Sequence, residues 1–96
     1  MMNRKVEALL NGETIISKEP GNSMLPLIKS KQPVKIKPIT WQEVKPGDIV
    51  YCKVSGNLYT HLVKAIDPKK GAQIGNNKGG INGWTKNVYG IVIEIL

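Results

Sequence analysis

Ten glycines and six prolines divide this chain of 96 residues into short segments. Most of the segments between them are rich in Ile, Val and Leu, as in 33–38 and 49–54, and Phe is absent. Short β-branched runs bounded by turn-forming residues are typical of strands. A chain of this length has room for only one modest core. The pattern therefore predicts a single, mainly β domain over residues 1–96.

Hydrophobic spacing predicts one helix and several strands. Residues 3–10 have the period of a short N-terminal helix, which Asn3 would cap. A turn at 55–57 predicts the clearest hairpin of the chain. Residues 27–30 suggest one helical turn, and the Gly- and Asn-rich residues 75–83 suggest a long irregular loop. The strands are expected over 13–18, 33–38, 49–54, 58–66, 72–74 and 88–96, the last interrupted by Gly90.

Several classes of protein are excluded by composition. Cys52 is the only cysteine, so there is no internal disulfide and a reducing compartment is expected; inside an apolar run it is interpreted as a small buried side chain. No segment approaches the roughly 18 apolar residues of a membrane span. Residues 1–10 lack the features of a signal peptide. We expect a soluble, cytoplasmic protein without a cofactor.

A basic run gives the chain a distinct charge pattern. The net charge is +7, and Lys29, Lys31, Lys35 and Lys37 follow one another without an intervening acid. Apolar residues alternate with the last two lysines, as in a half-exposed strand. We expect these lysines to lie on one solvated face, away from the segment around Ser23. Such a face suits weak contact with nucleic acid or with an acidic partner.

A serine lies on a sharp bend between a flexible Gly-Asn step and a Met-x-Pro corner. A hydroxyl presented on a rigid bend is what nucleophilic catalysis requires, so Ser23 is a candidate nucleophile. His61 is the only histidine and the candidate general base, because the ordinary pKa of histidine suits that role without a large shift. Lys64 is a rival base. Strand alternation puts His61 and Lys64 on opposite faces, which favours His61.

Five segments in a fixed order resemble a known superfamily. Together they resemble signal peptidases and LexA-type self-cleaving repressors, over residues 13–96, and in particular short stand-alone members from phages and prophages. The segments are GNSMLP at 21–26, KPGDIV at 45–50, HLV at 61–63, IGNN at 74–77 and YGIV at 89–92.

The resemblance implies a fold, an activity and two site residues. The fold would be a small, strongly bent antiparallel sheet of the signal-peptidase and LexA C-terminal type. Ser23 occupies the position of the nucleophile, and His61 that of the base in the endoplasmic-reticulum and archaeal members. The substrate would be a peptide or protein lying along an exposed strand edge.

The chain departs from the family pattern around the site. Residues 75–84 contain no carboxylate, whereas the family places aspartates there. Asn76 stands where Asp is usual, and Asn82 lies near the later acidic positions, so either amide is a candidate to orient His61. Gly21 occupies a position where many bacterial signal peptidases have a hydroxyl for the oxyanion hole.

The sequence therefore supports two functions. The first is a soluble serine peptidase-like hydrolase with a Ser-His dyad or a Ser-His-Asn arrangement. The second is a catalytically retired domain of the same fold that acts as a binding or assembly module, for example in a phage particle. Neither an Ala-Gly nor a Cys-Gly bond precedes Ser23, so self-cleavage of the LexA type is not expected.

Overall fold

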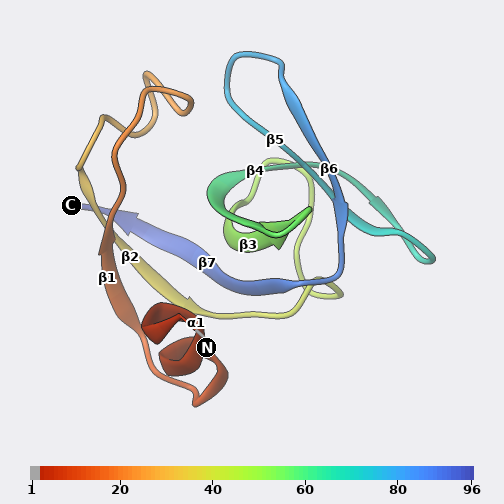
Figure 1. Cartoon of the computed structure of the whole chain (residues 1–96), viewed down its shortest axis with the longest axis horizontal. Helices are drawn as coiled ribbons and strands as arrows, with labels where there is room; N and C mark the ends of the chain where they lie inside the picture. The colour runs from red at the N-terminus through yellow and green to blue at the C-terminus, as the bar shows by residue number, and fades with distance from the viewer. Residues whose placement is uncertain (1–2) are drawn as a thin grey trace.

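The computed structural model describes residues 3–96 as one helix and one antiparallel sheet of seven strands (Figure 1). The prediction of a mainly β chain with a short N-terminal helix is confirmed. The strand order across the sheet is β1-β2-β7-β3-β4-β5-β6. The elements are α1 (Arg4–Leu10), β1 (Ile15–Lys18), β2 (Pro33–Pro38), β3 (Ile49–Val54), β4 (Asn57–Asp67), β5 (Gly71–Gly75), β6 (Ile81–Thr85) and β7 (Val88–Ile95).

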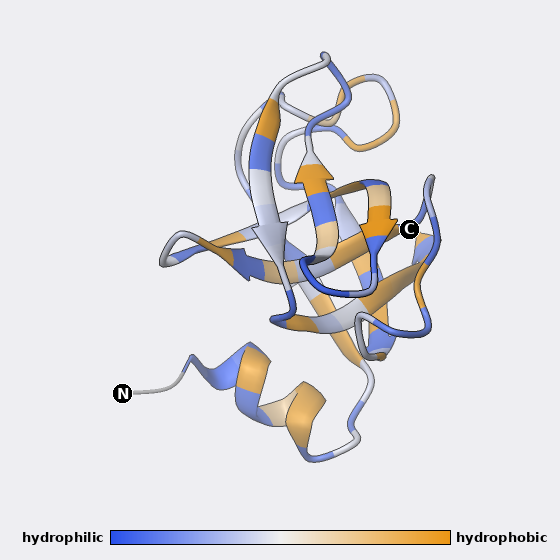
Figure 2. Ribbon diagram, turned by 90° about the vertical axis from the view of Figure 1, so that its right-hand side faces the viewer, coloured by the Kyte–Doolittle hydropathy of each residue, from blue (hydrophilic) through white to orange (hydrophobic). Residues whose placement is uncertain are grey.

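Helix α1 begins and ends where the sequence predicts. The side chain of Asn3 accepts a hydrogen bond from the backbone N–H of Lys5 at 2.7 Å, which satisfies one of the free donors of the first turn. Val6 and Leu9, three residues apart, bury the apolar face of the helix. In Figure 2, α1 lies at one end of the sheet, and it packs on β1, β2 and β7.

Gly90 allows strand β7 to approach helix α1 and strand β2 closely. A Cβ atom on Gly90 would overlap Ile36 Cγ2 and would lie 2.9 Å from the carbonyl oxygen of Lys37 and 3.1 Å from Leu9. The interruption of the apolar pattern at Gly90 is therefore a packing requirement of β7.

Two buried clusters form the core on either side of β7 and β3. The larger one joins β3, β4, β5 and the start of β7, and Val50 and Cys52 lie at its centre without solvent exposure. The smaller one joins α1, β2 and Tyr51. The expectation of a buried Cys52 is confirmed, and burial raises the pKa of its thiol to about 12.

Two of the predicted elements differ in the structure. Strand β6 covers Ile81–Thr85, most of which the sequence pattern assigns to a loop over 75–83; the irregular part is only 76–80. β6 is an edge strand that pairs with β5 alone, so it does not need the apolar alternation that reveals a central strand. Residues 27–30 are not helical; 22–28 form a series of turns instead.

The expectation that the four lysines lie away from the segment around Ser23 is wrong for Lys29. Lys29 and Lys31 belong to the connection between β1 and β2, and Lys29 lines a cavity beside Ser23. Lys35 lies on β2 and its Nζ is 3.5 Å from a carboxylate oxygen of Glu94 on β7. The basic run itself contains no acidic residue, but the pairing of β2 with β7 places Glu94 opposite Lys35. Within residues 3–96 no helix is long and apolar enough to cross a membrane.

Candidate functional site

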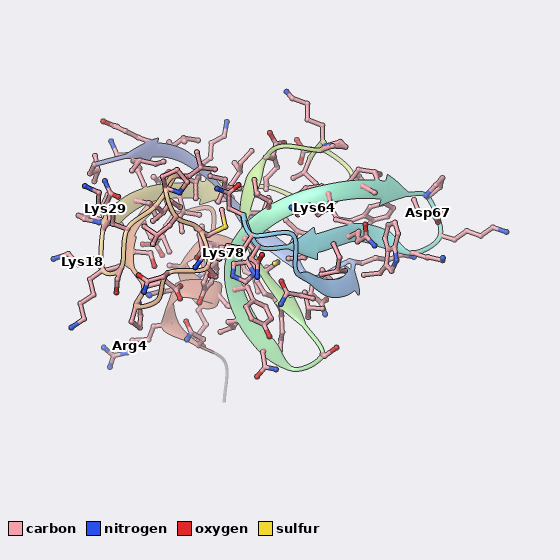
Figure 3. The ribbon with its side chains drawn as sticks, turned by 90° about the horizontal axis from the view of Figure 1, so that it is seen from above. Arg4, Lys18, Lys29, Lys64, Asp67 and Lys78 are labelled. Atoms are coloured by element: carbon pink, nitrogen blue, oxygen red, sulfur yellow. The ribbon has the colours of Figure 1, made fainter. Side chains whose placement is uncertain are left out.

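Three elements distant in sequence bring a serine, a histidine and an asparagine together. Ser23 comes from the connection between β1 and β2, His61 from β4 and Asn82 from the edge strand β6. Ser23 Oγ lies 2.9 Å from His61 Nε2, and Asn82 Oδ1 lies 2.7 Å from His61 Nδ1. Figure 3, seen from above, shows the connection between β1 and β2 that carries Lys29 and the β5–β6 loop that carries Lys78.

The contacts of His61 fit the tautomer that carries its proton on Nδ1. An amide oxygen only accepts, so Asn82 Oδ1 at 2.7 Å suits a protonated Nδ1. Nε2 then has a free lone pair, which accepts from the Ser23 hydroxyl. Both nitrogens have a partner, and the residue is only 7% exposed. This is the arrangement in which a neutral imidazole can remove a proton from a serine.

The serine segment is anchored on both sides of Ser23. Gly21 has a φ of 116°, a backbone conformation that favours glycine, and its N–H donates to Ser30 Oγ at 3.0 Å. Met24 is buried, and its carbonyl oxygen accepts from the N–H of Ile28 at 3.0 Å. The bend predicted at Ser23 is thus present and fixed.

The β5–β6 loop supplies a further anchor that the sequence analysis missed. Asn77 donates its backbone N–H to the carbonyl oxygen of Ser23 at 2.9 Å and its side-chain Nδ2 to that of Leu25 at 2.8 Å. The sequence signal was the polar composition of this loop, which does not distinguish one asparagine from the next.

The two candidate asparagines have different roles. Asn82 contacts His61, whereas Asn76 does not orient it. The Asn76 Oδ1 atom accepts from the backbone N–H groups of Lys78 and Gly80, at 2.8 and 2.9 Å, and so closes the loop on itself. Of the two candidate amides only Asn82 therefore lies against His61, because the short loop uses the Asn76 oxygen for its own turn.

Lys64 lies elsewhere on β4. The register of β4 against β5 shifts between Val63 and Ala65, so Lys64 is the extra residue of an irregularity in the strand. Its methylene chain runs beside Gly75, where a Cβ atom would come within 2.8 Å of Lys64 Cε. The alternation expected along this strand holds as far as Val63, which is buried like His61, and is interrupted beyond it.

Tyr59 is a second neighbour of His61 that the sequence analysis did not assign to the site. The two rings stack with centroids 4.8 Å apart and an interplanar angle of 23°. The signal was available in the sequence, because residues two apart on a strand share a face.

A cavity of about 330 Å³ opens beside Ser23 and His61. Its apolar lining includes Met24, Ile28 and Leu58, and its charged lining residues are Glu19 and Lys29. Cavities of this size and mixed lining are typical of small-ligand and side-chain binding sites. A substrate group seated here would lie next to the Ser23 hydroxyl.

The part of the chain that the structure describes contains no group of three His, Cys, Asp or Glu side chains able to hold a metal ion. Comparison of the chain with protein-family models, with curated proteins and with solved structures found no match.

Proposed function

We propose that the protein is a serine peptidase-like hydrolase of the signal-peptidase and LexA type, with Ser23 as nucleophile, His61 as general base and Asn82 as the residue that orients His61. One observation carries the proposal. Ser23 Oγ, His61 Nε2, His61 Nδ1 and Asn82 Oδ1 form a continuous hydrogen-bonded chain at 2.9 and 2.7 Å beside a cavity.

The proposed reaction has two halves. In the first, Ser23 Oγ attacks the peptide carbonyl carbon while Nε2 of His61 takes the hydroxyl proton; the tetrahedral intermediate collapses to an acyl-serine as His61 returns that proton to the leaving amine. In the second, His61 removes a proton from water as its oxygen attacks the acyl carbon, and then returns that proton to Ser23 Oγ as the C–O bond breaks and the carboxylic acid leaves. Backbone N–H groups at the serine bend are the proposed donors to the oxyanion, since Gly21 has no side chain for this role.

The cavity suggests how the substrate is held. The apolar side chains of Met24, Ile28 and Leu58 would accept an apolar side chain of the peptide next to the scissile bond. The peptide backbone would lie extended beside a strand edge, where main-chain hydrogen bonds supply affinity.

Covalent labelling tests the nucleophile directly. A fluorophosphonate probe followed by mass mapping should modify Ser23, and Ser23→Ala should remove both labelling and hydrolysis of a peptide or ester substrate. Because Ser23 is one of several anchored residues of its segment, we expect the melting temperature of the variant to stay close to that of the parent. Equal hydrolysis by the variant would contradict the proposal.

A pair of substitutions on β4 tests the base. His61→Ala should lower kcat by at least about a thousandfold, as loss of a catalytic base does in serine peptidases. Lys64→Ala should retain most of the activity, because its side chain runs beside Gly75. The reverse pattern would transfer the role of base to Lys64.

One observation favours a second candidate function, a binding or assembly module that has lost catalysis. The group facing His61 Nδ1 is a neutral amide, which cannot neutralise the imidazolium. In chymotrypsin-type enzymes an Asp-to-Asn change at the orienting position costs about 10⁴ in kcat. A folded parent protein that neither reacts with the probe nor hydrolyses any peptide would favour this module.

A further inference from the structure

The face of the His61 ring is covered by an aromatic side chain of the same strand. Tyr59 and His61 are two residues apart on β4, and their rings stack with centroids 4.8 Å apart at an interplanar angle of 23°. A cation held within about 6 Å of an aromatic centroid is attracted by the negative face of the ring. The position of His61 satisfies this distance once its imidazole is protonated.

Among residues 3–96, His61 has no charged hydrogen-bonding partner. Its two hydrogen bonds go to the Ser23 hydroxyl and the Asn82 amide, and its partner across the strand pair is Val50 on β3. The charged side chains that share its cavity are Glu19 and Lys29, which have opposite signs, and neither is hydrogen-bonded to the ring. Tyr59 is the aromatic group stacked on this ring, and its negative face can favour the positive form.

The Tyr59 ring is held in place independently of His61. It packs against the larger core cluster, and its backbone pairs with Cys52 of β3, whose Sγ lies 3.7 Å from the carbonyl oxygen of Tyr59. The adjacent Thr60 is tied by its hydroxyl to Glu19 at 3.3 Å. The strand that carries the ring is thus held by contacts that do not involve His61, and the ring itself packs on the core.

We propose that Tyr59 is a positioning residue that stabilises the imidazolium form of His61 through its ring face, because the group at Nδ1 is the neutral amide of Asn82. The inference rests on the proposed function for its effect on rate. The effect of Tyr59 on the protonation of His61 does not depend on the proposed function, because the two rings stack whether or not the protein is an enzyme.

Two substitutions separate the ring face from the hydroxyl and from simple packing. Tyr59→Phe keeps the ring and loses the hydroxyl, whereas Tyr59→Leu keeps apolar bulk and loses the ring. His61 is the only histidine of the chain, so the NMR titration of its ring protons in untagged protein needs no assignment. We expect Tyr59→Phe to titrate as the parent does and Tyr59→Leu to titrate about 0.5–1 pH unit lower, the size of a partly buried cation–π contact.

The rate should follow the same pattern. Measured well above the titration midpoint, Tyr59→Leu should lower kcat by about threefold to tenfold with little change in KM, and Tyr59→Phe should restore it. Tyr59→Met provides a second aliphatic variant if Tyr59→Leu does not fold, and circular dichroism identifies the folded ones.

The outcomes distinguish this inference from the proposed function. A lower titration midpoint in the aliphatic variant of a protein without hydrolytic activity would support the ring-face contact and contradict the enzyme. If the parent is an active enzyme and His61 titrates at the parent's pH in both the Phe and the aliphatic variants, the inference is overturned. The proposed enzyme is unaffected by that result. Equal shifts in the Phe and aliphatic variants would assign the effect to the hydroxyl and also overturn it.

Discussion

Asn77 of the β5–β6 loop anchors the backbone of Ser23: its N–H donates to the Ser23 carbonyl oxygen at 2.9 Å. Its side chain donates to the carbonyl oxygen of Leu25 at 2.8 Å. The same residue therefore hydrogen-bonds to the serine segment on both sides of Met24. The β5–β6 loop and the β1–β2 connection are thereby joined. The distance between Ser23 Oγ and His61 Nε2 depends on this joint as well as on the two side chains.

Loss of the Asn77 side chain should therefore impair hydrolysis more than it impairs folding. We expect Asn77→Ala to lower the free energy of unfolding by about 1 kcal/mol, the net value of one hydrogen bond. Displacement of a nucleophile by about 1 Å costs up to 10²-fold in rate, so kcat should fall by about tenfold or more. Urea titration and steady-state kinetics measure the two effects.

Two further variants sharpen the test of Asn77. Asn77→Asp has the same size but presents an acceptor to the Leu25 carbonyl oxygen, so its kcat should fall at least as far. Asn57→Ala, at the exposed start of β4, removes an asparagine remote from the serine segment and should change neither quantity. Unchanged kcat and probe labelling in Asn77→Ala would contradict a positioning role.

A carboxylate in place of the Asn82 amide should raise the rate. Asn82→Asp keeps an oxygen acceptor for His61 Nδ1 and adds a negative charge that stabilises the imidazolium. We expect kcat to rise by about tenfold or more, in view of the roughly 10⁴ cost of the opposite change in chymotrypsin-type enzymes. The rate should also rise with pH over a range displaced to higher pH, because the base holds its proton more tightly.

Asn76→Asp is the matched control for the charge at position 82. It adds the same charge, but the oxygen at position 76 faces the N–H groups of Lys78 and Gly80 instead of His61. Its kcat should stay near that of the parent. An equal gain in both variants would indicate a long-range effect of net charge, and no gain in either would remove Asn82 from the proposed mechanism.

The elements predicted best from the sequence are those whose local pattern agrees with their packing. The alternation in 33–38 matches the burial of Val34 and Ile36, and the turn at 55–57 joins β3 and β4. β6 was missed because an edge strand with glycine and polar residues has no periodic signal. β6 forms because it pairs with β5, and a local sequence pattern holds no information about that pairing.

The site shows the same division. The proximity of Ser23 and His61 was anticipated from motif order, and strand alternation favoured His61 over Lys64. The sequence leaves the choice between Asn76 and Asn82 open, because it depends on which loop oxygen the turn at 76–80 uses. The anchoring role of Asn77 depends on contact between two connections more than fifty residues apart, a distance at which local patterns carry no information.

Stability should fall in alkaline solution because two buried weak acids keep their protons in the folded protein. Burial raises the pKa of the Cys52 thiol from 9.0 to about 12, and burial, with the charge of Glu19 as a smaller cause, raises the pKa of the Tyr51 phenol from 10.0 to about 12. The unfolded chain releases these protons at lower pH. The contribution to stability is thus complete below about pH 9 and is lost as the pH rises from 9 to 12.

Tyr51→Phe isolates the contribution of the phenol. Urea titrations at pH 8 and at pH 11 should show a smaller loss of unfolding free energy in the variant than in the parent, while lysine titration affects both alike. An identical loss in the two proteins would show that the Tyr51 hydroxyl titrates equally in the folded and unfolded states. Cys52 should correspondingly resist alkylation in native protein and react once the chain is unfolded.

The dispersed lysines predict weak, sequence-independent binding to DNA. Lys35 is paired with Glu94 and Lys29 lines the cavity, so the four lysines at 29, 31, 35 and 37 do not act as one face. Replacing all four by Gln should weaken DNA binding no more than replacing the exposed Lys45, Lys53, Lys69 and Lys70, because each set removes four charges. The slope of log affinity against log salt should be about −0.9 per phosphate neutralised. Tight, sequence-specific binding that only the first set abolishes, with no probe labelling of Ser23, would favour the binding module over the enzyme.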